Sequence, residues 1–264
     1  MKIAIAGAAG RMGRTLIDLV LGAPDLVLSG AIEAAGHPAL GQNAGGPGAR
    51  SDVRITSDAA AAIAGADCLI DFTAPAATLA HLDLCALAGV AMVIGTTGLS
   101  PAERERVAAA SGRIPVVLAP NMAVGVNVIF KLAETAARAL GDAYDVEIIE
   151  AHHRHKVDAP SGTALRIGEI VARALGRDLA RNAAHGRRGD TGERDAKTIG
   201  FHAVRGGDIV GEHIVLFAGE GERVELVVRS TSRATYALGA LRASRFLKGR
   251  PPGLYDMQDV LALR

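Results

Sequence analysis

A dense group of ionisable side chains lies near the middle of the sequence, at residues 152–156. Three histidines, an arginine and a lysine fill these five positions, inside the stretch EAHHRHKVDAPSGTAL at 150–165. Because an unperturbed imidazole titrates at about pH 6.5, a histidine here can give or take a proton at neutral pH. A solvated basic turn is the alternative, since charged runs usually face water. We expect no metal site, because the spacing lacks the regular pairs of zinc motifs and neither cysteine is near in sequence.

The residues that follow the basic group predict the start of a helix at Pro160-Ser161-Gly162-Thr163. Backbone N–H groups at Gly162 and Thr163, the Thr163 hydroxyl and the positive end of the helix would form a cradle for a carboxylate. In an extended strand, residues 152 and 154 point to one side and 153 and 155 to the other, so the five side chains cannot all converge. We therefore predict that only some of them donate or accept a proton on a small anionic substrate.

A glycine-rich loop near the N-terminus predicts a second kind of site. Gly7-Ala-Ala-Gly10-Arg-Met-Gly13 joins an apolar run at 2–6 to the amphipathic segment RTLIDLVLG. Such a loop allows a tight turn and close approach of the backbone to a pyrophosphate at a helix N-terminus. Glu33 stands at the end of the next apolar run, about 20 residues past Gly13, where a carboxylate can bind a ribose diol. The alternative is a structural glycine turn with an unrelated surface glutamate.

The residue after Glu33 bears on which dinucleotide binds. It is Ala34, with no arginine beside it, whereas a site that prefers NADPH usually carries a cation there for the 2′-phosphate. The sequence therefore favours NADH or the use of both cofactors, unless Arg11 or another basic group substitutes.

The elements that must position these residues alternate along the first half of the chain. Continuous apolar runs are typical of parallel strands that are buried on both faces, and helical segments or loops separate them. This alternation predicts a Rossmann-type, doubly wound parallel α/β sheet. The expected strands are 2–6, 26–32, 53–55, 68–72, 91–94 and 116–119. The loops 71–75 and 95–98 follow two of them at the edge where such sheets bind ligands, although each is also consistent with a plain structural turn.

The second half predicts a separate α+β domain. An apolar stripe over 124–140, ended by Gly141, predicts a helix, and a strand at 144–151 leads into the basic group. Further strands are expected at 197–204, 209–217 and 223–229, the first two joined by a turn at 205–208, which gives a mixed sheet of roughly four strands. The polar segment 177–195 is expected to be a loop. We predict a dinucleotide-binding domain at 1–123, with 233–264 packed back on it, and a substrate-binding domain at 124–232.

Composition excludes other classes of protein. The formal net charge is +1, and there is no tryptophan and only three tyrosines and five phenylalanines, so nucleic-acid binding is not expected. No apolar window reaches the roughly 18 residues that a membrane-spanning helix needs. Cys68 and Cys85 lie in apolar segments, as small buried thiols in a reducing compartment do, and this favours the cytoplasm.

Several motifs taken together resemble one family, the 4-hydroxy-tetrahydrodipicolinate reductases (dihydrodipicolinate reductases). GAAGRMGR, DFTAP, GTTGLS, NMAVGVN and above all EAHHRHKVDAPSGTAL carry the resemblance, which covers essentially the whole chain. It implies NADH- or NADPH-dependent reduction of 4-hydroxy-tetrahydrodipicolinate to tetrahydrodipicolinate in the diaminopimelate branch of lysine biosynthesis. Hydride would be delivered to a conjugated imine, with proton transfer and loss of water, after domain closure. The resemblance also implies a homotetramer that assembles through the sheets of the second domain.

The resemblance assigns a role to each matching position. It makes His152 the proton donor or acceptor and Lys156 a second donor that also holds substrate. It gives substrate binding to His153, Gly162 and Thr163. The positions that it assigns to the cofactor are Gly7, Ala8, Ala9, Gly10, Arg11, Met12, Glu33, Gly95, Thr96, Thr97, Ala119, Pro120, Asn121 and Met122. Ala34 departs from the family pattern, where many members carry a basic residue.

Two other functions stay open at this point. One is another aspartate-pathway dehydrogenase that acts on a small carboxylate, such as a homoserine or aspartate dehydrogenase. The other is a dinucleotide sensor that keeps the fold and has lost catalysis. The basic loop and the Ser161-Gly162-Thr163 segment argue against the first, and the presence of both His152 and Lys156 argues against the second.

Overall fold

A computed structural model of the chain describes residues 1–49 and 51–264. It contains two compact units. Unit 1 comprises Met1–Val124 together with Arg233–Arg264, and unit 2 comprises Gly125–Ser232. Each unit has its own sheet, so each is described by itself.

Unit 1 is built on a seven-stranded sheet with the strand order β12-β6-β5-β4-β1-β2-β3. Its strand pairs are parallel, in agreement with the continuous apolar runs of the sequence. The strands are β1 (Lys2–Ala6), β2 (Val27–Ile32), β3 (Ile55–Thr56), β4 (Cys68–Asp71), β5 (Ala91–Ile94), β6 (Pro115–Leu118) and β12 (Gly253–Tyr255). The edge strand β12 comes from the C-terminal segment, in which the sequence predicted no strand.

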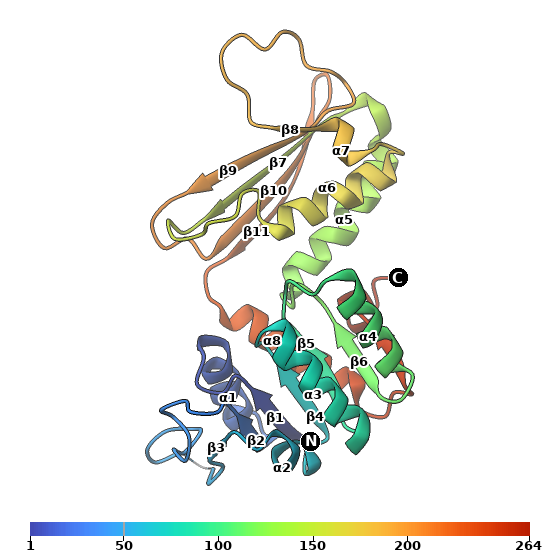
Figure 1. Ribbon diagram of the computed structural model, residues 1–264. Coiled ribbons are helices and arrows are strands. Elements are labelled where there is room, and N and C mark those ends of the chain that lie inside the picture. The colour runs from blue at the N-terminus through green and yellow to red at the C-terminus, as the bar shows by residue number, and fades with distance from the viewer. Residues whose placement is uncertain (50) are drawn as a thin grey trace. The chain divides into compact units, whose positions relative to one another are not determined.

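Helices cover both faces of this sheet (Figure 1), so the doubly wound α/β fold is confirmed. One face carries α1 (Arg11–Gly22), α8 (Ala234–Leu247) and α9 (Met257–Val260), whose apolar residues share a buried cluster with strand residues such as Ile5. The other face carries α2 (Ala59–Ala64), α3 (Pro75–Ala88) and α4 (Pro101–Ser111) in a second cluster. Cys68 and Cys85 are free and buried in these two clusters.

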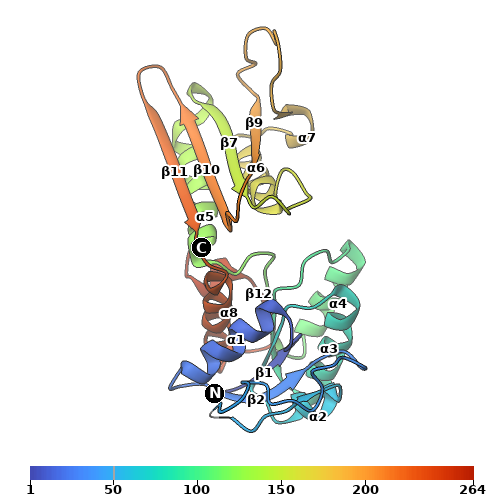
Figure 2. The same ribbon diagram turned by 90° about the vertical axis from the view of Figure 1, so that its left-hand side faces the viewer.

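Unit 2 is built on a five-stranded mixed sheet with the order β11-β10-β7-β9-β8. The strands are β7 (Asp145–His152), β8 (Ala183–His185), β9 (Ile199–Arg205), β10 (Gly211–Ala218) and β11 (Arg223–Ser230). The helices α5 (Val124–Leu140) and α6 (Gly162–Ala174) lie on one side of it (Figure 2). The short helices η1 (Gly141–Ala143) and α7 (Leu179–Asn182) complete the unit.

Two details of this sheet differ from the sequence-based expectation. The segment 177–195 is not all loop, because it contains α7 and the short strand β8, which adds a fifth strand beside β9. The strands β9 and β10 follow each other in the chain but flank β7, which pairs parallel with β9 and antiparallel with β10. Local turn residues at 205–208 cannot show that a strand from earlier in the chain lies between the two.

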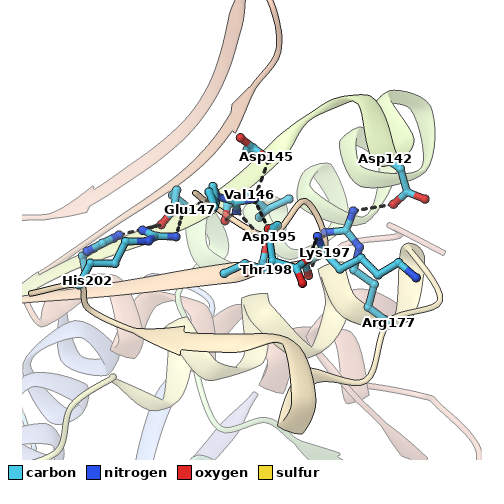
Figure 3. Close-up of polar contacts among 11 residues, drawn as sticks. Asp142, Asp145, Val146, Glu147, Arg177, Asp195, Lys197, Thr198 and His202 are labelled. Carbon is cyan, nitrogen blue, oxygen red and sulfur yellow. Dashed lines mark hydrogen bonds and ion pairs between the residues drawn. The ribbon is translucent and has the colours of Figure 1, made fainter. Parts of the chain in front are cut away.

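Strand β7 presents alternate residues to opposite faces of the sheet. Val146, Ile148, Glu150 and His152 are buried, and the residues between them are half-buried. On the half-buried face, Glu147 accepts hydrogen bonds from Arg187, Arg194 and His202 (Figure 3). Arg187 and Arg194 belong to the segment between β8 and β9, so Glu147 holds that segment against the sheet.

Across residues 1–49 and 51–264, no helix combines the length and the apolar character needed to cross a membrane.

Candidate functional site

Three neighbouring strands of unit 2 bring ionisable side chains to one end of the buried face of the sheet. In the register of β7 with β9, Arg205 stands opposite His152. In the register of β7 with β10, His213 stands opposite Glu150. The imidazole rings of His152 and His213 meet edge to face, with their centroids 5.2 Å apart. The sheet therefore gathers at one place residues that are more than 50 positions apart in the chain.

The carboxylate of Glu150 is the centre of this group. Its side chain is only 1% exposed. Arg205 donates two hydrogen bonds to it, one to each oxygen and each 2.7 Å long. The oxygen Oε2 also lies 2.6 Å from Nδ1 of His152. The oxygen Oε1 accepts a hydrogen bond of 3.1 Å from the backbone N–H of Ser161. Each carboxylate oxygen thus has two partners, as a buried charge requires.

The helix α6 begins at this carboxylate. Ser161 is its N-cap, and the Ser161 hydroxyl accepts a hydrogen bond from the N–H of Ala164 at 3.2 Å. The same hydroxyl lies 2.9 Å from Nε2 of His213. The predicted helix start is therefore confirmed, and Gly162 and Thr163 lie in the first turn. Glu150 connects this turn to His152, because its carboxylate contacts both Ser161 and His152.

The protonation of the two buried histidines follows from their surroundings. Burial lowers the pKa of His152, the hydrogen bond to Glu150 opposes this only in part, and the positive charges of Lys156 and Arg205 add to the lowering. Burial, with His152 beside it, lowers the pKa of His213 to about 4. Burial alone would raise the pKa of Glu150, but the hydrogen bonds from Arg205 and His152 outweigh it, so this pKa is lowered. At neutral pH the group therefore holds a carboxylate, a guanidinium and two neutral imidazoles.

The other members of the basic run leave the strand. The strand β7 ends at His152, and residues 153–156 form a turn in which Arg154 and His155 are exposed. His153 is half-buried, with its ring centroid 6.2 Å from that of His155. Lys156 forms an ion pair with Asp158, with Nζ 2.7 and 2.8 Å from the two oxygens. In this structure Lys156 is thus held by Asp158, while His152 belongs to the Glu150 group.

The glycine-rich loop of unit 1 has the close approaches that a dinucleotide-binding loop needs. Gly7 has a φ of +70°, a conformation that favours glycine. A Cβ atom on Gly13 would lie 2.0 Å from the carbonyl oxygen of Gly7, so only glycine fits there. The helix α1 starts at Arg11 with no side-chain cap from the described residues and no acid in its first turn. This positive helix end fits a pyrophosphate.

Glu33 lies against that loop. Its Oε2 accepts a hydrogen bond from the N–H of Ala9, and its Oε1 accepts one from the N–H of Ala34, both at 3.0 Å. The loop and the acidic residue, which the sequence paired by spacing alone, are therefore in contact. Ala34 itself is exposed.

The two further loops at the strand ends are joined through Asp71, which is fully buried at the end of β4. Its Oδ1 accepts hydrogen bonds from the N–H and hydroxyl of Thr73 and from the hydroxyls of Thr78 and Thr96. Its Oδ2 lies 2.7 Å from Nδ1 of His81. The loops 71–75 and 95–98 are thereby held together at the carboxyl edge of the sheet.

The remaining predicted cofactor positions surround the same edge. A Cβ on Gly95 would lie 2.2 Å from the ring of Phe72, so this glycine lets the two loops touch. Thr96, Ala119 and Met122 are buried, whereas Thr97 and Pro120 are exposed. Asn121 accepts a hydrogen bond from the N–H of Ala123.

Four residues of the unit 2 group were not predicted from the sequence as site residues, namely Glu150, Ser161, Arg205 and His213, although Glu150 and Ser161 lie within the motif at 150–165. One local signal for Glu150 was present, because Glu150 and His152 are two positions apart along a strand and must therefore share a face. Ser161 was recognisable as an N-cap. Arg205 and His213 had no such signal, because only the strand order brings them beside β7. In unit 1, the Asp71 group with His81 and Thr78 was also missed.

Comparison with known proteins shows what the chain is similar to. A family model described as "Dihydrodipicolinate reductase, N-terminus" matches residues 1–122, and one described as "Dihydrodipicolinate reductase, C-terminus" matches residues 125–261. The two together span nearly the whole chain.

Curated relatives and a solved structure agree with these matches. The 4-hydroxy-tetrahydrodipicolinate reductase of Aromatoleum aromaticum is 62% identical over 100% of this chain and 96% of its own length. That of Thiobacillus denitrificans is 59% identical over 100% of this chain and 99% of its own. A dihydrodipicolinate reductase from Paenisporosarcina sp. TG-14, solved with dipicolinate bound, has a TM-score of 0.79 and 25% identity, and covers 98% of each chain.

Proposed function

Because this chain belongs to the dihydrodipicolinate reductase family, we infer that it catalyses the NADH- or NADPH-dependent reduction of 4-hydroxy-tetrahydrodipicolinate to tetrahydrodipicolinate. The reaction belongs to the diaminopimelate branch of lysine biosynthesis. The resemblance noted in the sequence is thus matched over the whole chain by relatives about 60% identical.

The observation that carries the assignment to particular residues is the buried group around Glu150. In this group the Glu150 carboxylate contacts both the neutral imidazole of His152 and the backbone N–H of Ser161, the N-cap of α6. A side chain that can transfer a proton therefore lies close to a helix N-terminus that can bind a carboxylate. A flat dicarboxylate, the class of molecule bound in the Paenisporosarcina structure, has the chemistry that such a place accepts.

We assign the roles as follows. His152 donates or accepts the proton, and Lys156 is a second donor that also binds substrate. His153, Gly162 and Thr163 bind the substrate carboxylates. Lys156 forms an ion pair with Asp158 in this structure, and the third N–H of its ammonium group is the donor for substrate.

The cofactor belongs to unit 1. Gly7 to Met12 hold the pyrophosphate at the start of α1, and Glu33 accepts hydrogen bonds from the adenosine ribose. Gly95 to Thr97 and Ala119 to Met122 lie beside the nicotinamide. When bound, the reduced nicotinamide supplies the hydride, and the protein supplies position and the proton. Ala34 offers no cation to a 2′-phosphate, which favours NADH or the use of both cofactors, unless Arg11 or another basic group substitutes.

Two broader features complete the proposal. Unit 1 is the dinucleotide-binding domain, and unit 2 binds substrate and forms a homotetramer in the cytoplasm. The face of the unit 2 sheet opposite α5 and α6 supports an assembly surface, since Val204 and Val227 are exposed on it. The free, buried cysteines support a reducing compartment. Light scattering of the purified protein tests the tetramer, and a monomer would overturn it.

A steady-state assay tests the activity. We expect oxidation of NADH and of NADPH when the dicarboxylate is generated enzymatically in the cuvette. Turnover on other small carboxylates with none on this substrate would favour another aspartate-pathway dehydrogenase. Nucleotide binding by calorimetry without turnover would favour a sensor. Neither alternative is favoured by the comparisons, in which family models and relatives agree on the reductase.

A further inference from the structure

We propose that Glu150, held by Arg205, is the positioning residue that makes His152 competent for proton transfer and that joins it mechanically to the start of α6. This inference rests on the proposed function of His152, which it deepens. The carboxylate fixes which ring nitrogen of His152 carries the permanent proton. The other nitrogen, Nε2, is then the one that exchanges a proton with substrate.

Hydrogen-bond chemistry defines the tautomer. An ionised carboxylate only accepts hydrogen bonds, so the short contact between Oε2 and Nδ1 requires a proton on Nδ1. Arg205 keeps Glu150 ionised by donating to both of its oxygens. A neutral His152 must therefore carry its lone pair on Nε2.

The same carboxylate reaches the substrate-binding helix. Its Oε1 accepts from the N–H of Ser161, and the Ser161 hydroxyl caps α6 and contacts His213. The carboxylate of Glu150, whose side chain is 1% exposed, thus holds both the imidazole and the start of the helix in place. Because buried and fully partnered side chains rarely change rotamer, the distance between the two is set before substrate arrives.

The proton step then balances within these groups. When His152 is protonated, Nε2–H breaks to give its proton to the substrate, and the imidazole is left neutral with Nδ1–H still bonded to Glu150. The carboxylate stabilises the imidazolium without taking the proton itself, since Arg205 opposes its protonation. No oxidant or further reactant takes part in this transfer.

The charges that face His152 set the direction of a pH effect. Glu150 raises its pKa, whereas Lys156 and Arg205 lower it, and the adjacent His213, with its pKa of about 4, is neutral near neutral pH. Removing the negative charge of Glu150 leaves only groups that lower the pKa of His152. The limb of the pH profile that reports this imidazole must therefore move to lower pH, whether His152 acts as acid or as base.

The Glu150→Gln variant is the sharpest test, because the amide must place its NH2 group at one of the two oxygen positions. At the Oε1 position it would face donors from both Arg205 and Ser161. At the Oε2 position it would face only Arg205, and it could donate to an unprotonated Nδ1 of His152. We expect the second arrangement, which reverses the tautomer of His152.

The control is Glu147→Gln on the same strand. Glu147 is also a carboxylate held by arginines and a histidine, but it faces the other side of the sheet. We expect Glu150→Gln to lower kcat by about 10²-fold, at the lower end of what acid–base catalysis contributes, with an unchanged KM for NADH. The pH limb should shift in Glu150→Gln and stay in place in Glu147→Gln. An equal loss in both variants, with no shift of the limb, would show that Glu150 is merely structural.

A measurement without substrate keeps this inference apart from the proposed function. The 15N chemical shifts of the His152 ring, assigned by their loss in His152→Ala, report the tautomer directly. We expect Nδ1–H in the wild-type protein. An Nε2–H tautomer there would overturn the inference even if Glu150→Gln failed to fold. Absence of turnover by the wild-type enzyme would instead overturn the proposed function and leave the tautomer result standing.

Discussion

Glu150 and His152 are neighbours on the buried face of β7, with Oε2 of the carboxylate 2.6 Å from Nδ1 of the imidazole. Two positions along a strand return to the same face, so this contact is already implied by local geometry. Its burial and its link to Arg205 and Ser161 come from elements much further along the chain.

Removal of the His152 imidazole tests its assigned role. We expect His152→Ala to lower kcat by ~10²–10⁴-fold, because a general acid or base is lost, with little change in NADH binding. His155→Ala is the matched control, since His155 is exposed in the adjoining turn. Stopped-flow or steady-state oxidation of NADH gives kcat, and calorimetry gives the affinity. Normal turnover by His152→Ala would refute the role.

The glycine loop can be tested with two substitutions in one helix. Gly13→Ala would place a Cβ 2.0 Å from the Gly7 carbonyl oxygen, which forces the loop to move. We expect weaker NADH binding and a lower melting temperature, as overpacking costs about 1–3 kcal/mol. Gly22→Ala, at the other end of α1, meets no atom within 4 Å and should bind NADH normally. Equal affinity of both variants for NADH would argue against a close-approach role for Gly13.

The choice between cofactors is tested at the residue after Glu33. Ala34→Arg adds a cation beside the ribose-binding carboxylate, so we expect the ratio of kcat/KM for NADPH to that for NADH to rise. Ala35→Arg, also exposed, adds the same charge one position further along and controls for a general electrostatic effect. If the ratio stays constant in Ala34→Arg, the 2′-phosphate is read by another part of the protein.

Acid should destabilise unit 2 through His213. Its pKa falls from an ordinary value of 6.5 to about 4 in the folded protein. Between these values the unfolded chain takes up a proton that the folded protein does not. The free energy of unfolding should therefore fall as the pH drops from about 6.5 towards 4, by about 3 kcal/mol in all. Above that window His213 contributes no slope.

Urea unfolding at several pH values measures this effect. Glu150, His152 and Lys156 face His213, and the lowered pKa values of Glu150 and His152 change stability in the same direction as pH falls. In His213→Gln, an amide can still form a hydrogen bond with Ser161 but does not titrate. The free energy of unfolding of this variant should therefore fall less steeply with pH, by the contribution of His213. A slope as steep as in the wild type would assign the acid sensitivity to other groups.

Local pattern alone determined much of this protein. The apolar runs predicted the doubly wound sheet, because strands that are buried on both faces require apolar residues. The Gly7 to Gly13 loop predicted a nucleotide-binding edge, because a close approach of the backbone requires glycine. The helix start at Ser161 was readable for the same reason, since an N-cap is a local hydrogen bond. The Glu33 position followed from spacing, and the structure brings Glu33 into contact with Ala9.

The tertiary structure decided what the sequence could not. Strand order placed β7 between β9 and β10, and this put Arg205 opposite His152 and His213 opposite Glu150. Turn residues between β9 and β10 carry no information about a third strand, because pairing energy depends on partners far away in the chain. The same holds for Asp71, whose partners on two loops are joined only by the register of β4 with β5. The sequence alone shows the types of residue needed for proton transfer. Their contacts with one buried carboxylate form only when the sheet folds.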